Sequence, residues 1–314
     1  MTAQTAEPGP AGLTVGVVGL GAMGLRLATR IAGAGATLRC VDPAPAAAAR
    51  AAEEGLTVVE DVRDLASCDA VVLSLPTPDV VLDVVARLAD AAQAASAGAE
   101  AARPLVVIDT STIGPGDARA AARLAEERGQ AYADAPILGR PASVGQWTFP
   151  VGGDEETVAF VRRVLAPAAR AVERVGPVGT AAATKVLNNL MLGTINAVTA
   201  ELLVLAEAAG LDPGRWVDLV VDSGAASVSP LFRDVAARAV DGDFEPTFTL
   251  QLLHKDNALA LDLADELRVP MITGRAAQQL TTMGLAAGHG AEDTIAVLKV
   301  LESITGRQAR RHVS

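Results

Sequence analysis

A single lysine marks the second half of the chain as a place where proton transfer could occur. Residues 175–200 read as one long apolar helix with its lead-in, and Lys185 is their only charged residue. Asn189 follows at i+4, so the two side chains point from one helical face toward one site, while Asn188 lies three positions on. A lysine can give or take a proton at a carbonyl oxygen, and an amide can hold that oxygen without competing for the proton. The alternative is a lysine whose stem packs while its head reaches water.

A glycine-rich loop near the start of the chain carries the second chemical signature. The stretch VVGLGAMG places Gly19, Gly21 and Gly24 directly after an apolar run and at the mouth of a helical pattern. In a dinucleotide-binding loop the first glycine permits a tight turn, the second lets the backbone approach a pyrophosphate, and the third lets helix pack on strand. The helix N-terminus adds free N–H groups for the phosphates. We therefore expect cofactor contacts from Gly19, Leu20, Gly21, Ala22, Met23 and Gly24.

Asp42 stands at the end of the second predicted strand, about 20 residues beyond the glycines, where the dinucleotide fingerprint requires an acid. A carboxylate there accepts hydrogen bonds from the adenosine ribose and repels a 2′-phosphate. The residues that follow offer no Arg or Lys until Arg50. The sequence therefore favours NAD as the cofactor, with NADP as the alternative. A helix N-cap before Pro43 is a compatible structural role for Asp42.

Two halves of different periodicity must position these groups. Short apolar runs at 13–19, 37–42, 69–76 and 104–111 predict buried strands, and segments at 22–34, 78–92 and 115–128 predict helices between them. This alternation predicts an α/β, Rossmann-type, doubly wound domain over 13–177, after a disordered leader at 1–12. Beyond it, residues 178–314 read as an all-α domain, with helices near 180–210, 213–222, 226–240, 249–267, 270–287 and 291–305.

Composition excludes several classes of protein. The formal charge of −11 and the pI near 4.8 argue against nucleic acid or an anionic membrane surface as a partner. Two cysteines, Cys40 and Cys68, without metal-type spacing indicate a reducing compartment. The three histidines, His254, His289 and His312, form no recognisable metal-ligand set. No uncharged apolar run reaches membrane-spanning length, so we expect a cytoplasmic protein.

Five motifs in order give the chain a family resemblance. With the glycine loop, DTSTIGP (109–115), DAPILGRP (134–141), GTAAATKVLNN (179–189) and LLHKD (252–256), it resembles the β-hydroxyacid dehydrogenases. This family includes 3-hydroxyisobutyrate dehydrogenase and tartronate semialdehyde reductase and is related to 6-phosphogluconate dehydrogenase. The resemblance implies a Rossmann-type domain joined by a long helix to an all-α domain, in a homodimer or homotetramer.

The resemblance also implies roles for individual residues. Lys185 aligns with the family's catalytic lysine, and Asn189 with its companion asparagine. Thr112 aligns with a Ser/Thr that contacts cofactor and substrate, although it could also cap the helix near Pro115. Lys255 aligns with a lysine that closes over the cofactor, but with Asp256 it could form an ordinary solvated pair. Two further cofactor positions lie at a strand end: Leu75 and Pro76.

One motif departs from the family pattern in the segment expected to bind substrate. The family commonly has Ser-Gly-Gly where this chain has Leu138, Gly139 and Arg140. We hypothesise that Arg140 replaces the missing serine as a bidentate anchor for a substrate carboxylate. A surface arginine on a Gly/Pro loop is the alternative. Trp147 and Phe149 could wall the same pocket or fill core. A second, smaller departure is Ala181, which stands where a glycine often precedes the lysine.

The sequence thus predicts an NAD(P)-dependent oxidoreductase that moves a hydride between nicotinamide and a small 3-hydroxy acid or its semialdehyde. Lys185 would act as general acid and base, and the partner would be a small acidic molecule. An imine reductase on the same scaffold is one alternative, motivated by the altered segment at 138–140. A non-catalytic, cofactor-binding interaction protein is another, since fold does not guarantee activity.

Overall fold

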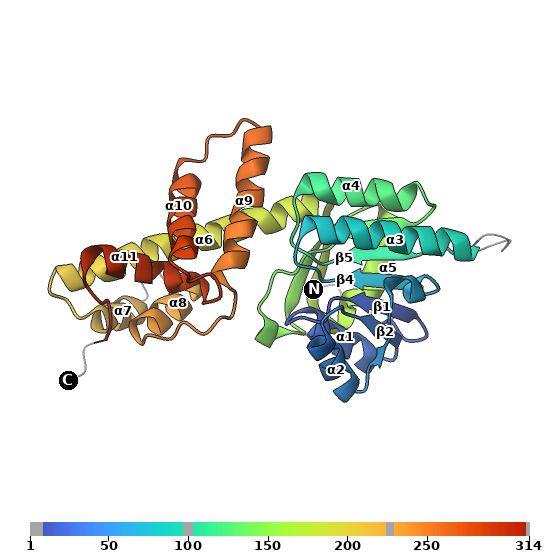
Figure 1. Cartoon of the computed structure of the whole chain (residues 1–314), viewed down its shortest axis with the longest axis horizontal. Helices are drawn as coiled ribbons and strands as arrows, with labels where there is room; N and C mark the ends of the chain where they lie inside the picture. Colours follow the sequence, from blue (N-terminus) through green and yellow to red (C-terminus); the bar gives the residue numbers. More distant parts are fainter. Residues whose placement is uncertain (1–8, 97–102, 224–228, 312–314) are drawn as a thin grey trace, which may run out of the picture. The chain divides into compact units, whose positions relative to one another are not determined.

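The computed structural model describes residues 9–96, 103–223 and 229–311, and its chain forms two compact units (Figure 1). The units span Met1–Lys185 and Val186–Ser314, so their division falls within helix α6 (Thr180–Ala208), a few residues after the boundary expected at 177. Residues 1–8 of the expected leader, 226–228 of the helix expected near 226–240, and His312 lie outside the described residues. Disorder of the leader over 9–12 is wrong, because Pro10 is buried and the N–H of Gly12 donates to the carbonyl oxygen of Gly35 at 3.4 Å.

The first unit is built on one eight-stranded sheet in the order β3-β2-β1-β4-β5-β6-β7-β8. Every neighbouring pair is parallel except β6 and β7, which confirms the predicted mostly parallel sheet. The strands are β1 (Thr14–Val18), β2 (Thr37–Val41), β3 (Thr57–Val58), β4 (Ala70–Leu73), β5 (Val106–Asp109), β6 (Ala131–Asp134), β7 (Trp147–Gly152) and β8 (Ala169–Gly176).

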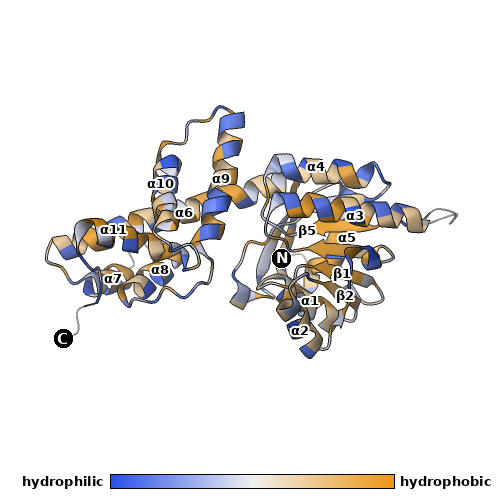
Figure 2. Cartoon of the chain, in the orientation of Figure 1, coloured by the Kyte–Doolittle hydropathy of each residue, from blue (hydrophilic) through white to orange (hydrophobic). Residues whose placement is uncertain are grey.

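Helices cover both faces of this sheet because its strands are apolar on both sides (Figures 1 and 2). On β1, Val17 belongs to the cluster beneath one set of helices and Val18 to the cluster beneath the other. The first set is α1 (Gly24–Gly33), α2 (Pro45–Glu53) and α5 (Glu155–Leu165); the second is α3 (Pro78–Ser96) and α4 (Pro115–Glu126).

The second unit is helical in its described residues, as predicted. Proline opens two of its helices, where the missing N–H costs nothing, and Asp212 and Ser229 cap them. The helices after α6 are α7 (Pro213–Asp222), α8 (Pro230–Val240), α9 (Leu250–Glu266), α10 (Ile272–Ala286) and α11 (Val297–Thr305), the last preceded by a 3-10 turn, η4 (Thr294–Ala296). The core of this unit packs α6 against these helices through residues such as Leu203, Phe232 and Leu250.

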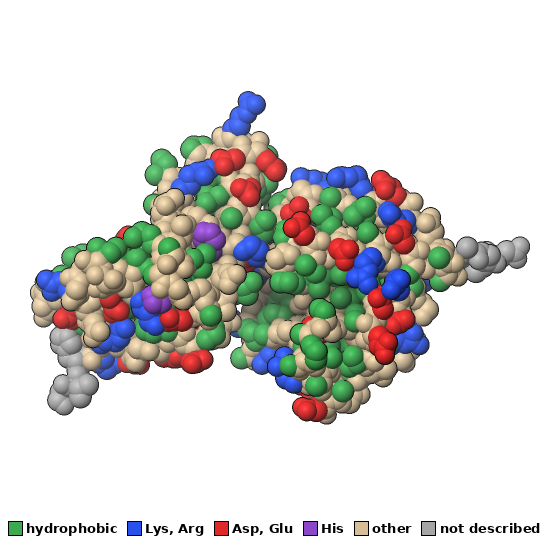
Figure 3. All heavy atoms as spheres, in the orientation of Figure 1, with side chains coloured by type: hydrophobic (Ala, Val, Ile, Leu, Met, Phe, Trp, Pro, Cys, Tyr) green, Lys and Arg blue, Asp and Glu red, His purple; other side chains and the backbone are tan. Residues whose placement is uncertain are grey.

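Helix α6 is long and apolar enough to cross a membrane by length and composition alone. However, 56% of its most apolar window is buried inside the protein, and its inner face carries the buried polar side chains Asn189, Asn196 and Thr199. A core helix passes the same test, so this feature is weak evidence for a membrane span. On the face shown in Figure 3, acidic and basic side chains are interspersed over each unit.

Candidate active site

The glycine loop has the shape that a pyrophosphate requires. Gly19 has φ +91°, and a Cβ there would clash with the carbonyl oxygen of Ser74. A Cβ at Gly24, the first residue of α1, would clash with the carbonyl oxygen of Gly19. A Cβ at Gly21, in contrast, would have nothing within 4 Å, so the backbone there faces open space. Met23 at the N-cap gives α1 no side-chain cap, which leaves its first N–H groups for a phosphate. The loop therefore fits a dinucleotide.

Asp42 follows β2 directly and braces the same loop. Its Oδ2 accepts a hydrogen bond from the backbone N–H of Leu20 at 2.7 Å, and its Oδ1 accepts one from that of Ala44 at 2.8 Å. Helix α2 has Ala44 as its N-cap, so Asp42 acts at the turn before the helix rather than as the cap itself. Each carboxylate oxygen keeps a second acceptor position, which leaves Asp42 able to bind ribose hydroxyls.

The other predicted cofactor positions of the first unit, Leu75, Pro76 and Thr112, follow strands of the same sheet. Leu75 follows β4, and its N–H donates to Ser111 Oγ at 2.9 Å, which ties the ends of β4 and β5 together. Pro76 is exposed and Thr112 is half-buried. Helix α4 has Gly114 as its N-cap, so Thr112 does not cap it. Because β2, β1, β4, β5 and β6 are neighbours and parallel, their carboxyl ends form one row, where ligands of open α/β sheets bind.

Lys185 is held at the last position of this row. Its half-buried side chain donates from Nζ to the carbonyl oxygen of Ile137 at 2.7 Å, and Ile137 lies just beyond β6. The ammonium thus contacts the backbone directly before Leu138, Gly139 and Arg140. The structure therefore brings the predicted proton donor and the predicted substrate segment together within the first unit.

A buried aspartate that the sequence analysis did not single out fixes the start of α6. Asp134 closes β6, is 2% exposed, and accepts hydrogen bonds from the backbone N–H groups of Gly179 (2.9 Å) and Ala182 (2.7 Å). Burial raises the pKa of this carboxyl, against the lowering effect of the two helix N–H groups. A Cβ at Gly152, on the neighbouring strand β7, would clash with its Oδ1. Asp134 and Ile137 therefore hold α6 at its first turn and at Lys185.

The altered substrate segment is clamped by a tryptophan. Trp147 Nε1 donates to the carbonyl oxygen of Arg140 at 2.7 Å, and its ring lies so close to Gly139 that a Cβ there would clash with it. Leu138 pairs with Thr148 of β7 through two backbone hydrogen bonds. Arg140 itself is exposed. Trp147 and Phe149 are both 0% exposed and pack edge to face, so these aromatics fill core rather than wall a pocket.

In the second unit, a buried aspartate joins the two remaining candidates. Asp256 is 2% exposed; its Oδ2 accepts from Asn189 Nδ2 at 2.6 Å, and its Oδ1 pairs with Lys255 Nζ at 2.8 Å. Asn189 is itself buried, and its Oδ1 accepts from Nδ2 of the exposed Asn188 at 3.1 Å. The Lys255–Asp256 pair is therefore not an ordinary solvated one. Asn189 retains one amide N–H beyond its bond to Asp256.

The periodicity of the sequence gives no indication that Asp134 and Asp256 are buried and bonded to α6. Asp134 lies 45 positions from Gly179, and Asp256 lies 67 positions from Asn189, so their partners exist only in the folded chain. The one available hint was their position inside two of the quoted motifs, beside residues already chosen as candidates.

Fold and site together define a Rossmann-type, nicotinamide dinucleotide-binding oxidoreductase, and comparison with known families agrees. Residues 14–176 match the family model described as the NAD binding domain of 6-phosphogluconate dehydrogenase. Residues 179–301 match the one described as NAD-binding of NADP-dependent 3-hydroxyisobutyrate dehydrogenase.

Individual relatives cover almost the whole chain. A 2-(hydroxymethyl)glutarate dehydrogenase of Eubacterium barkeri is 32% identical over 94% of this chain and 96% of its own. A probable 3-hydroxyisobutyrate dehydrogenase of Mycobacterium bovis is 34% identical over 92% of this chain and 98% of its own. The solved structure of Mycobacterium tuberculosis 3-hydroxyisobutyrate dehydrogenase with L-serine has a TM-score of 0.80 at 33% identity, covering 92% of this chain and 99% of that one.

The chain belongs to the β-hydroxyacid dehydrogenase family. It is an NAD(P)-dependent oxidoreductase that acts on the CH–OH group of a hydroxy acid.

The bonds from Asp134 to α6 generate a stability prediction. In Asp134→Asn the amide keeps one acceptor but turns a donor toward the second helix N–H, which leaves that buried group unpaired. We expect the free energy of unfolding to fall by about 1–3 kcal/mol, measured by urea denaturation followed by circular dichroism. Asp79→Asn, at an exposed position in the first turn of α3, is the control and should stay within about 0.5 kcal/mol of wild type. Equal midpoints for the two variants would contradict this account.

Proposed function

We propose that the chain catalyses reversible hydride transfer between NAD and a small 3-hydroxy acid or its semialdehyde, with Lys185 as the general acid and base. The observation that carries the proposal is the contact of Lys185 Nζ with the Ile137 carbonyl oxygen. It holds an ammonium at the edge of the sheet that carries the glycine cradle. A proton donor and a hydride source at one edge are what carbonyl reduction needs.

The nicotinamide supplies or takes the hydride when it is bound. The residues of the chain transfer the proton and position the substrate. In reduction, Lys185 Nζ gives a proton to the substrate oxygen as negative charge develops there; in oxidation, the neutral amine takes that proton. The Ile137 carbonyl keeps the amine in place through either protonation state. The remaining amide N–H of Asn189, one helical turn along α6, serves to hold the substrate oxygen.

NAD is the proposed cofactor in preference to NADP. The argument rests on Asp42, whose carboxylate is held at the end of β2 by the N–H groups of Leu20 and Ala44. A carboxylate fixed in this way accepts from ribose hydroxyls and opposes a 2′-phosphate. Leu75, Pro76 and Thr112 are the proposed cofactor contacts from the neighbouring strand ends, and Lys255 is the one from the second unit.

A small acid is the proposed substrate class. Both of the named relatives act on hydroxy acids, and one neighbouring structure contains L-serine, which is also a small carboxylate with a CH–OH group. In this chain Leu138 stands where the family has serine, and Arg140, two residues further on, is the proposed replacement. Its backbone is fixed by Trp147, so its side chain starts from a rigid base close to the segment that holds Lys185. A planar, bidentate donor suits a carboxylate.

Exposed and buried side chains support a proposal for assembly and location. Val198, Leu202 and Leu205 are 45%, 39% and 62% exposed along one stripe of α6 in the second unit. Such a stripe suits contact with a second copy, so we propose a homodimer or homotetramer. Cys40 and Cys68 are free and buried, which suits a reducing, cytoplasmic location. Neither nucleic acid nor a membrane is a proposed partner.

Removal of the ammonium tests the catalytic role. Lys185→Met keeps the apolar stem, and Lys185→Arg keeps the charge but cannot release a proton at neutral pH. We expect both to lower kcat at least about a hundredfold, measured by NADH formation at 340 nm with a panel of 3-hydroxy acids. NADH binding, followed by its fluorescence, should stay unchanged. Turnover by Lys185→Met at the wild-type rate would refute the assignment.

The carboxylate anchor makes a separate kinetic prediction. Arg140→Ala should raise KM for acidic substrates by about tenfold or more, the size of a lost charge-assisted hydrogen bond, while kcat changes little. Arg170→Ala, at another exposed arginine of this unit, should leave KM near wild type. An unchanged KM in Arg140→Ala for every acid tested would mean that the arginine is a surface residue only.

The proposed assembly is tested with a charge on the α6 stripe. Wild type should elute as a dimer or larger particle in size-exclusion chromatography with light scattering. Leu205→Asp should shift toward the monomer, because a carboxylate in an apolar interface is costly to desolvate. Leu267→Asp, at a position 65% exposed beyond the end of α9, is the matched control and should assemble normally. A monomeric wild type would end the proposal.

A further inference from the structure

The only tyrosine of the chain is buried in the first unit, beside the edge that carries the candidate active site. Tyr132 belongs to β6 and is 4% exposed. Side chains alternate along a strand, so Tyr132 faces the same side of the sheet as Asp134. Tyr132 is paired with Val107 of β5 in the register, and its hydroxyl donates to Asp109 Oδ2, two residues further along β5, at 2.8 Å. The phenol therefore links the carboxyl ends of β5 and β6, and no step of the proposed reaction uses it.

The hydroxyl of Tyr132 is a stable donor to this carboxylate. Burial first, and the charge of Asp109 in addition, raise the pKa of Tyr132 well above its usual value, so the phenol keeps its proton. Asp109 is 0% exposed, and a buried carboxylate is costly unless its oxygens are hydrogen-bonded. Its Oδ2 accepts from the phenol, and its Oδ1 accepts from the backbone N–H of Ser111 at 2.9 Å. Tyr132 and the turn at Ser111 are thus bound to the two oxygens of one carboxylate.

Asp109 also has a second aspartate beside it, because it stands opposite Asp134 in the register of β5 and β6. Neighbouring carboxylates repel each other; burial first, and the charge of Asp109 in addition, raise the pKa of Asp134. The protein gives each carboxylate its own donors. Two N–H groups of α6 and its lead-in bind Asp134, while the phenol of Tyr132 binds Asp109. Loss of the phenol hydroxyl therefore removes a donor from a buried carboxylate that is also repelled by its neighbour.

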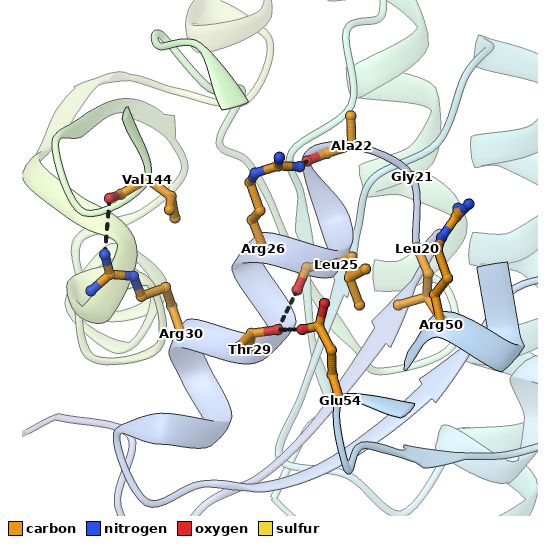
Figure 4. Close-up of a pocket in the computed structure, with 10 residues that line it drawn as sticks. All are labelled: Leu20, Gly21, Ala22, Leu25, Arg26, Thr29, Arg30, Arg50, Glu54 and Val144. Carbon is orange, nitrogen blue, oxygen red and sulfur yellow. Dashed lines mark hydrogen bonds between the residues drawn. The ribbon is translucent and has the colours of Figure 1, made fainter. Parts of the chain in front are cut away.

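The turn that Asp109 holds contacts the strand end beside the glycine loop. Ser111 is buried, and its Oγ accepts the backbone N–H of Leu75 at 2.9 Å. Leu75 follows Ser74, whose carbonyl oxygen lies so close to Gly19 that a Cβ there would clash with it. Directly after that glycine, the loop forms one wall of a pocket of about 570 Å³ (Figure 4). A displacement of the turn at Ser111 therefore reaches the glycine loop through direct contacts.

We infer that Tyr132 is a positioning residue for the nicotinamide dinucleotide. Through Asp109 it fixes the turn at Ser111, and that turn fixes Leu75 beside the glycine loop. The inference rests on the proposed role of Leu75 as a cofactor contact. It goes beyond that role because it makes a buried hydroxyl on β6 responsible for dinucleotide affinity. The glycine loop binds the pyrophosphate, which NAD and NADP share, so the hydroxyl supports the binding of both dinucleotides alike.

Fluorescence titration with NADH and with NADPH, in the absence of any hydroxy acid, tests the inference. Tyr132→Phe removes only the hydroxyl. It should weaken both dinucleotides by a common factor of about five to ten, which is less than the full loss of a hydrogen bond to a charged group because the effect passes through the turn. In steady-state kinetics, KM for the dinucleotide should rise by that factor, while kcat at saturation stays within about twofold of wild type.

Gln130→Met is the matched control, because it removes a buried hydrogen bond from the other end of the same two strands. Gln130 directly precedes β6, is 7% exposed, and accepts the backbone N–H of Leu105, directly before β5, at 2.8 Å. Both variants should lower the melting temperature, measured by circular dichroism, since each loses a buried hydrogen bond. Only Tyr132→Phe should weaken the dinucleotides. Equal NADH affinities in the two variants would overturn the inference and leave Tyr132 as a residue that supports the fold alone.

Ser111→Ala tests the later step of the path and leaves Tyr132 in place. It removes the acceptor for the N–H of Leu75 and should weaken NADH by a similar factor. Because both changes act on one path, the double variant should bind NADH within about twofold of the weaker single variant. An unchanged NADH affinity in Ser111→Ala, or effects that multiply in the double variant, would also overturn the inference.

Failure of the proposed dehydrogenase activity gives a different pattern. In that case no hydroxy acid is turned over by wild type, while the affinities for NADH and NADPH still respond to Tyr132→Phe and Ser111→Ala.

Discussion

The candidate active-site edge of the first unit depends on one buried carboxylate. Asp134 receives the backbone N–H groups of Gly179 and Ala182, and so attaches the first turn of α6 to the end of β6. A buried charge of this kind is tolerated only when its oxygens are bonded, and these two bonds also fix the helix that carries Lys185. Three residues further along the same segment, the carbonyl oxygen of Ile137 holds the ammonium.

A second buried aspartate acts on the same helix in the other unit. Asp256 binds the amide of Asn189 and pairs with Lys255, so one carboxylate orients two of the residues that the sequence proposed. Lys185 thus lies between two anchored parts of α6, its first turn and Asn189. The carboxylates of Asp134 and Asp256 are both buried and hydrogen-bonded, and these bonds give α6 a defined position. A lysine on a helix without such bonds would be held less firmly.

Parallel topology explains why groups far apart in the sequence meet at one edge. Asp42, the glycine loop, Leu75, Thr112 and Ile137 each follow a strand, and those strands are neighbours that run in the same direction. The proposed cofactor contacts and the proposed proton donor therefore lie at the same end of the sheet.

The sequence alone was enough to predict those strands, helices and loops that depend on residues close together in the chain. Continuous apolar runs located β1, β2, β4 and β5, proline and capping residues located the helices of the second unit, and the spacing of Gly19, Gly21 and Gly24 located the cofactor loop. It did not reveal β3, β6, β7 or β8, since β3 is very short, β6 has Tyr132 as its only large apolar residue, β7 contains a proline, and β8 is polar at the sheet edge.

Only the tertiary structure decided which groups are partners. It placed Trp147 in the core beneath Gly139, joined Asp134 to α6 and Asp256 to Asn189, and exposed Arg50 beside the glycine loop. These relations depend on contacts across tens of residues and on burial, which a linear pattern does not encode. The physical reason is that hydrogen bonds and desolvation act between neighbours in space, and folding alone creates those neighbours.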